Sequence, residues 1–180
     1  MSRSSFVLIP FAPDAKNPQL LSLTGVVDRH SSTLTITYDL QGHLDTIVIA
    51  APVKFPTRQD NLWQTTCFEF FVGIPGSDRY WEFNLSPAGH WNVYRFDSYR
   101  QGMEEELAFP TLPFQVEFGV ERLSLTIAWD LAAIVPANQP LEVAITAVIQ
   151  AQSGEITYWA LTHPGTEADF HRRDSFVLII

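Results

Sequence analysis

Alternation of apolar and polar residues with a period of two runs through most of the chain. It is regular over residues 33–38, 114–120 and 123–129, and residues 141–149 place their odd-numbered side chains, all apolar, on one face. This period is typical of β-strands whose two faces differ. Glycine- and proline-containing turns separate the strands, and helical patterning is confined to short stretches. The pattern therefore predicts an all-β fold, an antiparallel sandwich or barrel of about ten to twelve strands.

The middle of the chain predicts a three-stranded meander over residues 68–72, 80–86 and 90–96, whose two faces differ. One face is apolar and is expected to fill a core: Phe68, Phe70, Val72, Trp81, Phe83, Leu85, Trp91 and Val93. The other combines polar and aromatic side chains: Glu69, Phe71, Tyr80, Glu82, Asn84, His90, Asn92 and Tyr94. The two apolar sets must share one side of the sheet, because a slip of one residue would place them on opposite sides.

The first hairpin of the meander brings two carboxyl groups together. A four-residue loop at 74–77 keeps the apolar faces aligned and would set Glu69 directly opposite Glu82. Like charges in such a pair are destabilising. The pair therefore predicts a neutralising arginine, for which Arg58 is the candidate, or a bound calcium ion, or a shared proton. A general acid/base couple is less favoured, because directly opposed residues lie closer than the carboxyls of glycoside hydrolases.

The second hairpin, closed at residues 87–89, aligns the polar groups of the same face. It should set Asn84 opposite Asn92 and Glu82 opposite Tyr94. Carboxylates accept hydrogen bonds from sugar hydroxyls, amides donate and accept, and aromatic rings stack on C–H surfaces. The outer face of an antiparallel sheet is equally expected to meet water. The pattern leaves a ligand-binding face and a plain solvated face both open.

Two segments of the meander region carry a family resemblance. The first is residues 58–71, where Leu-Trp precedes the Phe-Glu-Phe of the first meander strand. The second is residues 80–91, with the sequence Tyr-Trp-Glu-Phe-Asn-Leu-Ser-Pro-Ala-Gly-His-Trp. They resemble the DOMON-like superfamily, which includes the family 9 carbohydrate-binding modules. Residues 161–164 and 168–171 are similar to the closing segment of the same group. The resemblance spans roughly residues 5–180 and implies an immunoglobulin-like or jelly-roll antiparallel β-sandwich.

Members of this superfamily bind sugars or haem. By matching position, the resemblance implies sugar-binding roles for Trp63, Glu69, Glu82, Asn84 and Trp91, although the register places Trp91 on the core face. Combined with the polar face, it predicts these ligand-binding residues: Arg58, Trp63, Glu69, Glu82, Asn84 and Tyr94. We expect one domain over residues 1–180, a non-catalytic module that binds a carbohydrate. The alternatives are a haem-binding or electron-transfer module and a protein-interaction sandwich without a small-molecule site.

Composition narrows the classes of partner. The 180 residues include 11 basic and 20 acidic side chains, for a net charge of −9, which disfavours nucleic-acid binding and polybasic attachment to membranes. A single cysteine, Cys67, excludes an intrachain disulfide and multi-cysteine metal centres. The sequence holds no glycine-rich phosphate loop, nucleophile elbow or long apolar segment. We expect a cytoplasmic protein that is not an enzyme and carries no cofactor.

Histidine and methionine offer the remaining metal-binding chemistry. Haem ligation would need one or two axial side chains, which Met103 and any of the five histidines could supply. His163 and His171 flank Asp169, an arrangement that could hold a metal ion. Their spacing has no regular meaning in a helix or strand, which favours a loop hydrogen-bond network instead.

Overall fold

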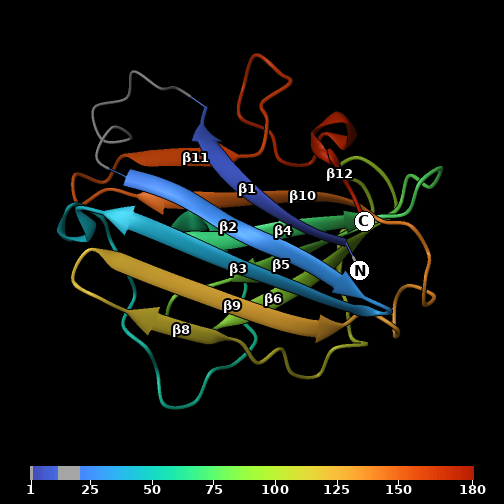
Figure 1. The fold of residues 1–180 in the computed structure, drawn as a ribbon, viewed down its shortest axis with the longest axis horizontal. Coiled ribbons are helices and arrows are strands. Elements are labelled where there is room, and N and C mark those ends of the chain that lie inside the picture. The colour runs from blue at the N-terminus through green and yellow to red at the C-terminus, as the bar shows by residue number, and fades with distance from the viewer. Residues whose placement is uncertain (1, 12–20) are drawn as a thin grey trace.

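The computed structural model describes residues 2–11 and 21–180, and this part of the chain forms antiparallel β-structure with no α-helix (Figure 1). Twelve strands lie within it: β1 (Ser2–Pro10), β2 (Leu21–His30), β3 (Thr33–Gly42), β4 (Cys67–Gly73), β5 (Tyr80–Leu85), β6 (Trp91–Phe96), β7 (Glu104–Glu105), β8 (Gln115–Phe118), β9 (Arg122–Asp130), β10 (Glu142–Gln150), β11 (Ile156–Ala160) and β12 (Leu178–Ile179). Short 3-10 turns occur at η2 (Leu44–Thr46), η3 (Leu62–Gln64) and η4 (Arg173–Ser175). The all-β prediction is confirmed.

The strands form one continuous, strongly curled sheet. Hydrogen bonds join them in the order β7-β6-β5-β4-β10-β11-β1-β2-β3-β9-β8, and β12 pairs with β10. Strand β1 belongs to both halves of the sheet, because its first part pairs with β2 and its last two residues pair with β11. The halves face each other: Tyr38 on β3 lies with its ring 5.1 Å from that of Phe68 on β4. Its hydroxyl donates to the Glu69 carbonyl oxygen at 2.6 Å.

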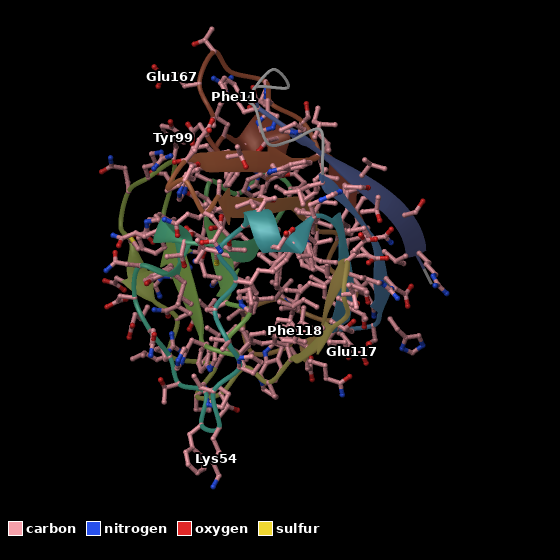
Figure 2. All side chains as sticks on the ribbon, turned by 90° about the vertical axis from the view of Figure 1, so that its left-hand side faces the viewer. Phe11, Lys54, Tyr99, Glu117, Phe118 and Glu167 are labelled. Atoms are coloured by element: carbon pink, nitrogen blue, oxygen red, sulfur yellow. The ribbon has the colours of Figure 1, made fainter. Side chains whose placement is uncertain are left out.

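Apolar side chains fill the space between the two halves (Figure 2). The predicted apolar face of the meander is part of this main core, Trp91 included: Phe68, Phe70, Val72, Trp81, Phe83, Leu85, Trp91 and Val93. The second hairpin of the meander also has the predicted register, with Asn84 opposite Asn92 and Glu82 opposite Tyr94.

The predicted register of the first hairpin is wrong by two residues. Strand β4 ends at Gly73 and β5 begins at Tyr80, so the connection is longer than the predicted four-residue loop. Glu69 lies opposite Asn84, and Glu82 is its diagonal neighbour. A shift of two residues returns every side chain to the same face, so the facial pattern could not distinguish the two registers. The carboxyls still share one face, without the direct opposition that the sequence predicted.

Gly25 on β2 leaves room for an aromatic contact, and a side chain there should destabilise the fold. Phe6 and Tyr38 both pair with Gly25, and their rings meet edge to face at 5.8 Å. An added Cβ would lie 2.1 Å from the Thr37 carbonyl oxygen and 2.3 Å from Phe6 Cζ. We expect Gly25→Ala to lower the free energy of unfolding by about 1–3 kcal/mol, because overpacking forces backbone and ring to move. In the control Gly119→Ala, the nearest atom would be 3.4 Å away. Urea unfolding followed by tryptophan fluorescence measures both, and equal midpoints would contradict the prediction.

Candidate functional site, a cavity on the second face of the meander

The polar and aromatic face of the meander is buried, so the alternative of a solvated outer face is wrong. Every residue of β4 and β5 is buried, on both faces of the sheet. A second apolar cluster forms on this side, separate from the main core: Phe71, Tyr80, Tyr94, Phe96, Ala144, Val148, Ala160, Phe170 and Phe176. Phe170 and Phe176 come from the C-terminal segment, which folds back over the sheet. The aromatic rings of the face supply the apolar area that this segment buries.

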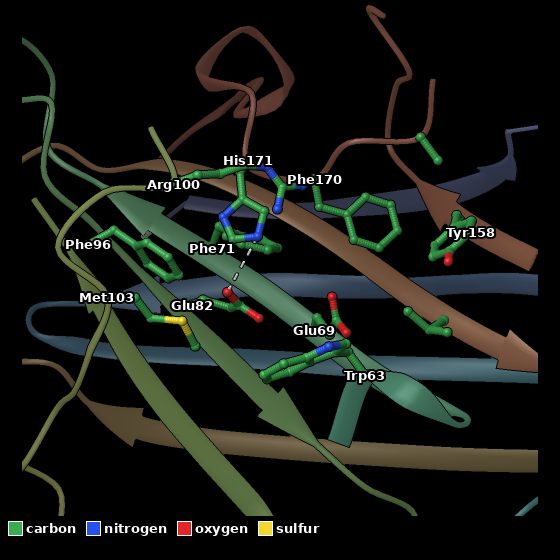
Figure 3. Close-up of a pocket in the computed structure, with 12 residues that line it drawn as sticks. Trp63, Glu69, Phe71, Glu82, Phe96, Arg100, Met103, Tyr158, Phe170 and His171 are labelled. Atoms are coloured by element: carbon green, nitrogen blue, oxygen red, sulfur yellow. Dashed lines mark ion pairs between the residues drawn. The ribbon is translucent and has the colours of Figure 1, made fainter. Parts of the chain in front are cut away.

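A cavity of about 320 Å³ lies between this face and the segments that cover it (Figure 3). Its lining combines apolar side chains with five charged or titratable ones: Trp63, Glu69, Phe71, Glu82, Phe96, Arg100, Met103, Val148, Tyr158, Ala168, Phe170 and His171. Small-molecule sites have volumes of roughly 300–1,000 Å³ and mostly apolar walls with a few convergent polar groups. The cavity has the size and composition of a site for a small ligand.

Glu69 supplies the most unusual group in the cavity. The residue is only 2% exposed, and within the described part of the chain its Oε1 is buried without a hydrogen-bond partner. Burial, together with the nearby Glu82 carboxyl, raises the pKa of Glu69 well above its ordinary value. A buried polar atom without a partner costs free energy and is rare in native proteins. A ligand in the cavity would give this oxygen a partner.

Glu82 presents a second carboxyl to the same space. Its Oε1 accepts a hydrogen bond from Asn84 Nδ2 at 2.8 Å. Its Oε2 lies 3.7 Å from His171 Nε2, the contact drawn as a dashed line in Figure 3. Burial raises the pKa of Glu82 to about 7. Of the three neutralising devices that the sequence predicted for this carboxyl pair, retained protons fit these shifts best.

His171 faces Glu82 as a neutral imidazole. Burial and the Arg100 charge lower the pKa of His171 to about 4. Its Nδ1 lies 2.8 Å from the Tyr80 hydroxyl, which accepts the Arg100 backbone N–H at 3.2 Å. With the Tyr80 hydroxyl as the donor to Nδ1, the ring proton of the neutral imidazole lies on Nε2, the nitrogen nearest Glu82.

Arg100 lines the cavity, and its charge is paired with Asp169. Its guanidinium donates to Asp169 Oδ1 at 2.8 Å, and the Tyr99 hydroxyl donates to Asp169 Oδ2 at 2.5 Å. His163 lies elsewhere, with its Nε2 2.9 Å from the Ile9 carbonyl oxygen. Within residues 2–11 and 21–180, no group of three or more His, Cys, Asp or Glu side chains is arranged to hold a metal ion. Asp169 thus belongs to a loop network, as the sequence favoured.

Arg58 does not neutralise the carboxyl pair, which corrects the prediction for this residue. It joins the outer edge of the meander instead, where its guanidinium stacks on the Trp91 ring 4.3 Å from the centroid. It donates to Asn92 Oδ1 at 2.6 Å and to the backbone oxygens of Glu106 and Phe109 at 2.9 and 2.6 Å. Its charge is thereby committed to holding a long connection against the sheet.

The other predicted site residues divide into lining and supporting groups. Trp63, on η3, lines the cavity together with Glu69 and Glu82. The rings of Tyr94 and Trp63 meet edge to face at 5.7 Å, and the Tyr94 hydroxyl donates to Asp60 at 2.7 Å. Asn84 is fully buried and holds Glu82. Tyr94 and Asn84 therefore do not line the cavity but hold Trp63 and Glu82, which do.

Sequence reasoning missed most of the residues that close the cavity. Arg100 and Met103 come from the connection after β6, and Phe170 and His171 come from the C-terminal segment. Periodicity says nothing about such connections, because their side chains are placed by tertiary packing. The signals for His171 were its position in the closing motif at 168–171 and its place beside Asp169, and Met103 was named only as a candidate haem ligand.

Comparison with known proteins gives a structural relative. No protein-family model matches the chain, and no curated protein matches it. The fold is similar to a solved structure described as a "putative carbohydrate-binding protein" from Bacteroides uniformis ATCC 8492, with a TM-score of 0.72 and 13% sequence identity. The similarity covers 96% of this chain and 83% of that one. In the part of this chain that the structure describes, no helix is long and apolar enough to cross a membrane.

Proposed function

We propose that the cavity binds a small carbohydrate or carbohydrate-like molecule and that the protein is a non-catalytic binding module. The observation that carries this proposal is the buried Glu69 carboxyl, which lines a cavity walled by aromatic side chains and has one oxygen without a hydrogen-bond partner among the described residues. Hydroxyl groups of a sugar would donate to the carboxyl oxygens, and its C–H face would stack on Trp63. The carbohydrate-binding description of the structural neighbour supports the same class of ligand.

The placement of the two carboxyls supports the non-catalytic role. Glu69 and Glu82 project from neighbouring strands on one face of the sheet, so both approach a ligand from the same side. Glycoside hydrolysis needs two carboxyls that flank the scissile bond. The DOMON-like and family 9 resemblance, its immunoglobulin-like or jelly-roll sandwich and a cytoplasmic location belong to this proposal as well.

Haem binding is the second candidate function, because Met103 and His171 both line the cavity and both are types of haem ligand. It is less favoured, because it gives no role to the unpartnered Glu69 carboxyl. An absorption spectrum recorded during haem titration tests it, and the absence of a Soret band shift would exclude it. The protein-interaction alternative would be favoured by a carboxyl network with Arg58 and no adjoining cavity, whereas the carboxyls line a cavity and Arg58 lies elsewhere.

Trp63→Ala should weaken saccharide binding at least about tenfold, because the loss of one stacked aromatic ring costs roughly 1.5 kcal/mol or more. Isothermal titration calorimetry against a panel of mono- and disaccharides measures the effect. Phe55→Ala is the matched control, since Phe55 is 74% exposed beside Lys54 on a projecting loop (Figure 2). Circular dichroism checks that both variants fold. A wild-type protein that binds no saccharide in the panel at millimolar concentration would overturn the proposal.

A further inference from the structure

The charged groups of the cavity are unbalanced in favour of acceptors. Two carboxyl groups, those of Glu69 and Glu82, line the cavity together with one guanidinium, that of Arg100. Asp169 already pairs with Arg100 at 2.8 Å. His171 lies 3.7 Å from Glu82 and is a neutral neighbour. Within the described residues the charge of Arg100 acts on Glu82, but Arg100 is paired with Asp169, and no lysine or arginine contacts the Glu69 or Glu82 carboxyl directly. Ionisation of both carboxyls would therefore leave buried charge that is only partly compensated.

The free acceptor positions also lie on these two residues. Glu69 Oε1 is buried and has no hydrogen-bond partner in the described chain. Glu82 Oε1 is occupied by Asn84, whereas Glu82 Oε2 makes no closer polar contact there than the 3.7 Å approach of His171. Acceptors from adjacent strands thus converge on one space. A hydroxyl group can donate one hydrogen bond into it, whereas a protonated amine can donate three and also carries the missing positive charge.

The walls of the cavity suit a cation as well. Trp63, Phe71, Phe96 and Phe170 surround the carboxyls (Figure 3). The faces of aromatic rings attract ammonium groups, and the attraction grows when the site excludes water. A cavity that is aromatic on its sides and acidic on its floor resembles in its chemistry the aromatic sites that hold alkylated ammonium ions.

We propose that the ligand of this cavity is a saccharide that carries a protonated amine, with the ammonium group held between Glu69 and Glu82 and the sugar ring against Trp63. This inference rests on the proposed carbohydrate function and narrows its ligand class. The amine supplies both the donors and the charge that the cavity lacks, and the hydroxylated ring fills the remaining volume of about 320 Å³.

Binding of such a ligand should release protons. An ammonium beside the two carboxyls favours their ionised forms, and so opposes the burial that raises the pKa values of Glu69 and Glu82. Other titratable or charged groups surround the pair and belong in the same titration: Cys67, Tyr80, Tyr94, Arg100, Asp169 and His171. Calorimetry at pH 7 in two buffers of different ionisation enthalpy counts the protons released, and a neutral sugar should release none.

The decisive experiment compares matched sugars on the full-length protein. We expect glucosamine or galactosamine to bind at least about tenfold more tightly than glucose or galactose, and more tightly than the N-acetylated forms, since a neutral amide cannot supply the charge. Glu69→Gln and Glu82→Gln should each weaken amino-sugar binding more than neutral-sugar binding, and so reduce this preference toward one. Glu155→Gln, at an exposed turn, should leave the preference unchanged.

A different binding result would contradict each part of this inference. Equal binding of amino and neutral sugars, or tightest binding of the N-acetylated forms, would overturn the inference while the carbohydrate site stands. Binding of methylammonium or choline with the same affinity as the amino sugars would overturn the saccharide part of it. An amine preference that survives both glutamine variants would overturn the assignment to Glu69 and Glu82. The absence of any sugar binding would instead remove the proposed function itself.

Discussion

Glu69→Gln should be more stable than the wild-type protein at pH 8, and the difference should shrink as the pH falls to 5. Burial and the neighbouring Glu82 raise the pKa of Glu69 well above its ordinary value. Between the ordinary pKa of the unfolded state and the raised pKa of the folded state, the folded protein holds a proton that the unfolded chain has released. The free energy of unfolding therefore falls as the pH rises through this range. Glutamine keeps the shape and cannot ionise. The gain at pH 8 should be several kcal/mol, which corresponds to roughly 5–10 °C in the unfolding midpoint.

Glu82 and His171 shape the rest of the pH profile with opposite signs. The pKa of Glu82 is raised to about 7, so its contribution to the free energy of unfolding decreases as the pH rises from the ordinary pKa of a glutamate to about 7. The pKa of His171 is lowered to about 4, so its contribution to the free energy of unfolding increases as the pH rises from about 4 to the ordinary pKa of a histidine. The two nearly offset each other in mildly acidic solution, so the decline in wild-type stability with rising pH comes mainly from Glu69.

Differential scanning calorimetry from pH 5 to pH 9 on the wild type, Glu69→Gln and the control Glu155→Gln measures this profile. The control should follow the wild type throughout, because Glu155 is exposed. A Glu69→Gln variant that is less stable than the wild type at pH 8 would show that the carboxyl stabilises the fold and would remove the basis of the binding site. A carboxyl that weakens the fold is instead typical of a functional site, where stability is lost for the sake of binding.

The two faces of the meander show how far sequence reasoning reaches. Alternation placed Phe83 in the core and Glu82 on the other face, and both placements are confirmed. The turn at 87–89 set the second hairpin correctly, because a tight turn leaves little freedom in register. The first hairpin has a longer connection, and a pattern with a period of two cannot distinguish registers that differ by two residues.

The burial of the second face could not be predicted from the strands themselves. Its cover comes from Phe170 and Phe176, which lie about 90 residues beyond Tyr80 in the sequence, in a segment without regular periodicity. Once that segment folds back, it makes the outer face one wall of a cavity and brings His171 to Glu82. The sequence therefore indicated the floor of the site, Glu69 and Glu82 with Trp63 beside them, and missed the groups that close it.

Arg58→Ala should lower the free energy of unfolding by roughly 2–4 kcal/mol, since hydrogen bonds to a charged donor contribute about 1.5–3 kcal/mol each and their buried acceptors would lose partners. The guanidinium joins Asn92, Glu106 and Phe109 and stacks on Trp91. Arg58→Lys should recover less than half of the loss, because an ammonium cannot reproduce the planar fork of donors.

The matched control for Arg58 is Arg122→Ala, which removes a surface pair with Asp39 and should lower the free energy of unfolding much less, because exposed ion pairs contribute little. Urea unfolding measures all three variants, and equal losses for Arg58→Ala and Arg122→Ala would contradict the structural role. Saccharide titration at low temperature, where the variant remains folded, separates that role from binding. Arg58 lies outside the cavity lining, so folded Arg58→Ala should keep wild-type affinity. Lost affinity at wild-type stability would instead place this arginine in the ligand site and make its assignment to the sheet edge wrong.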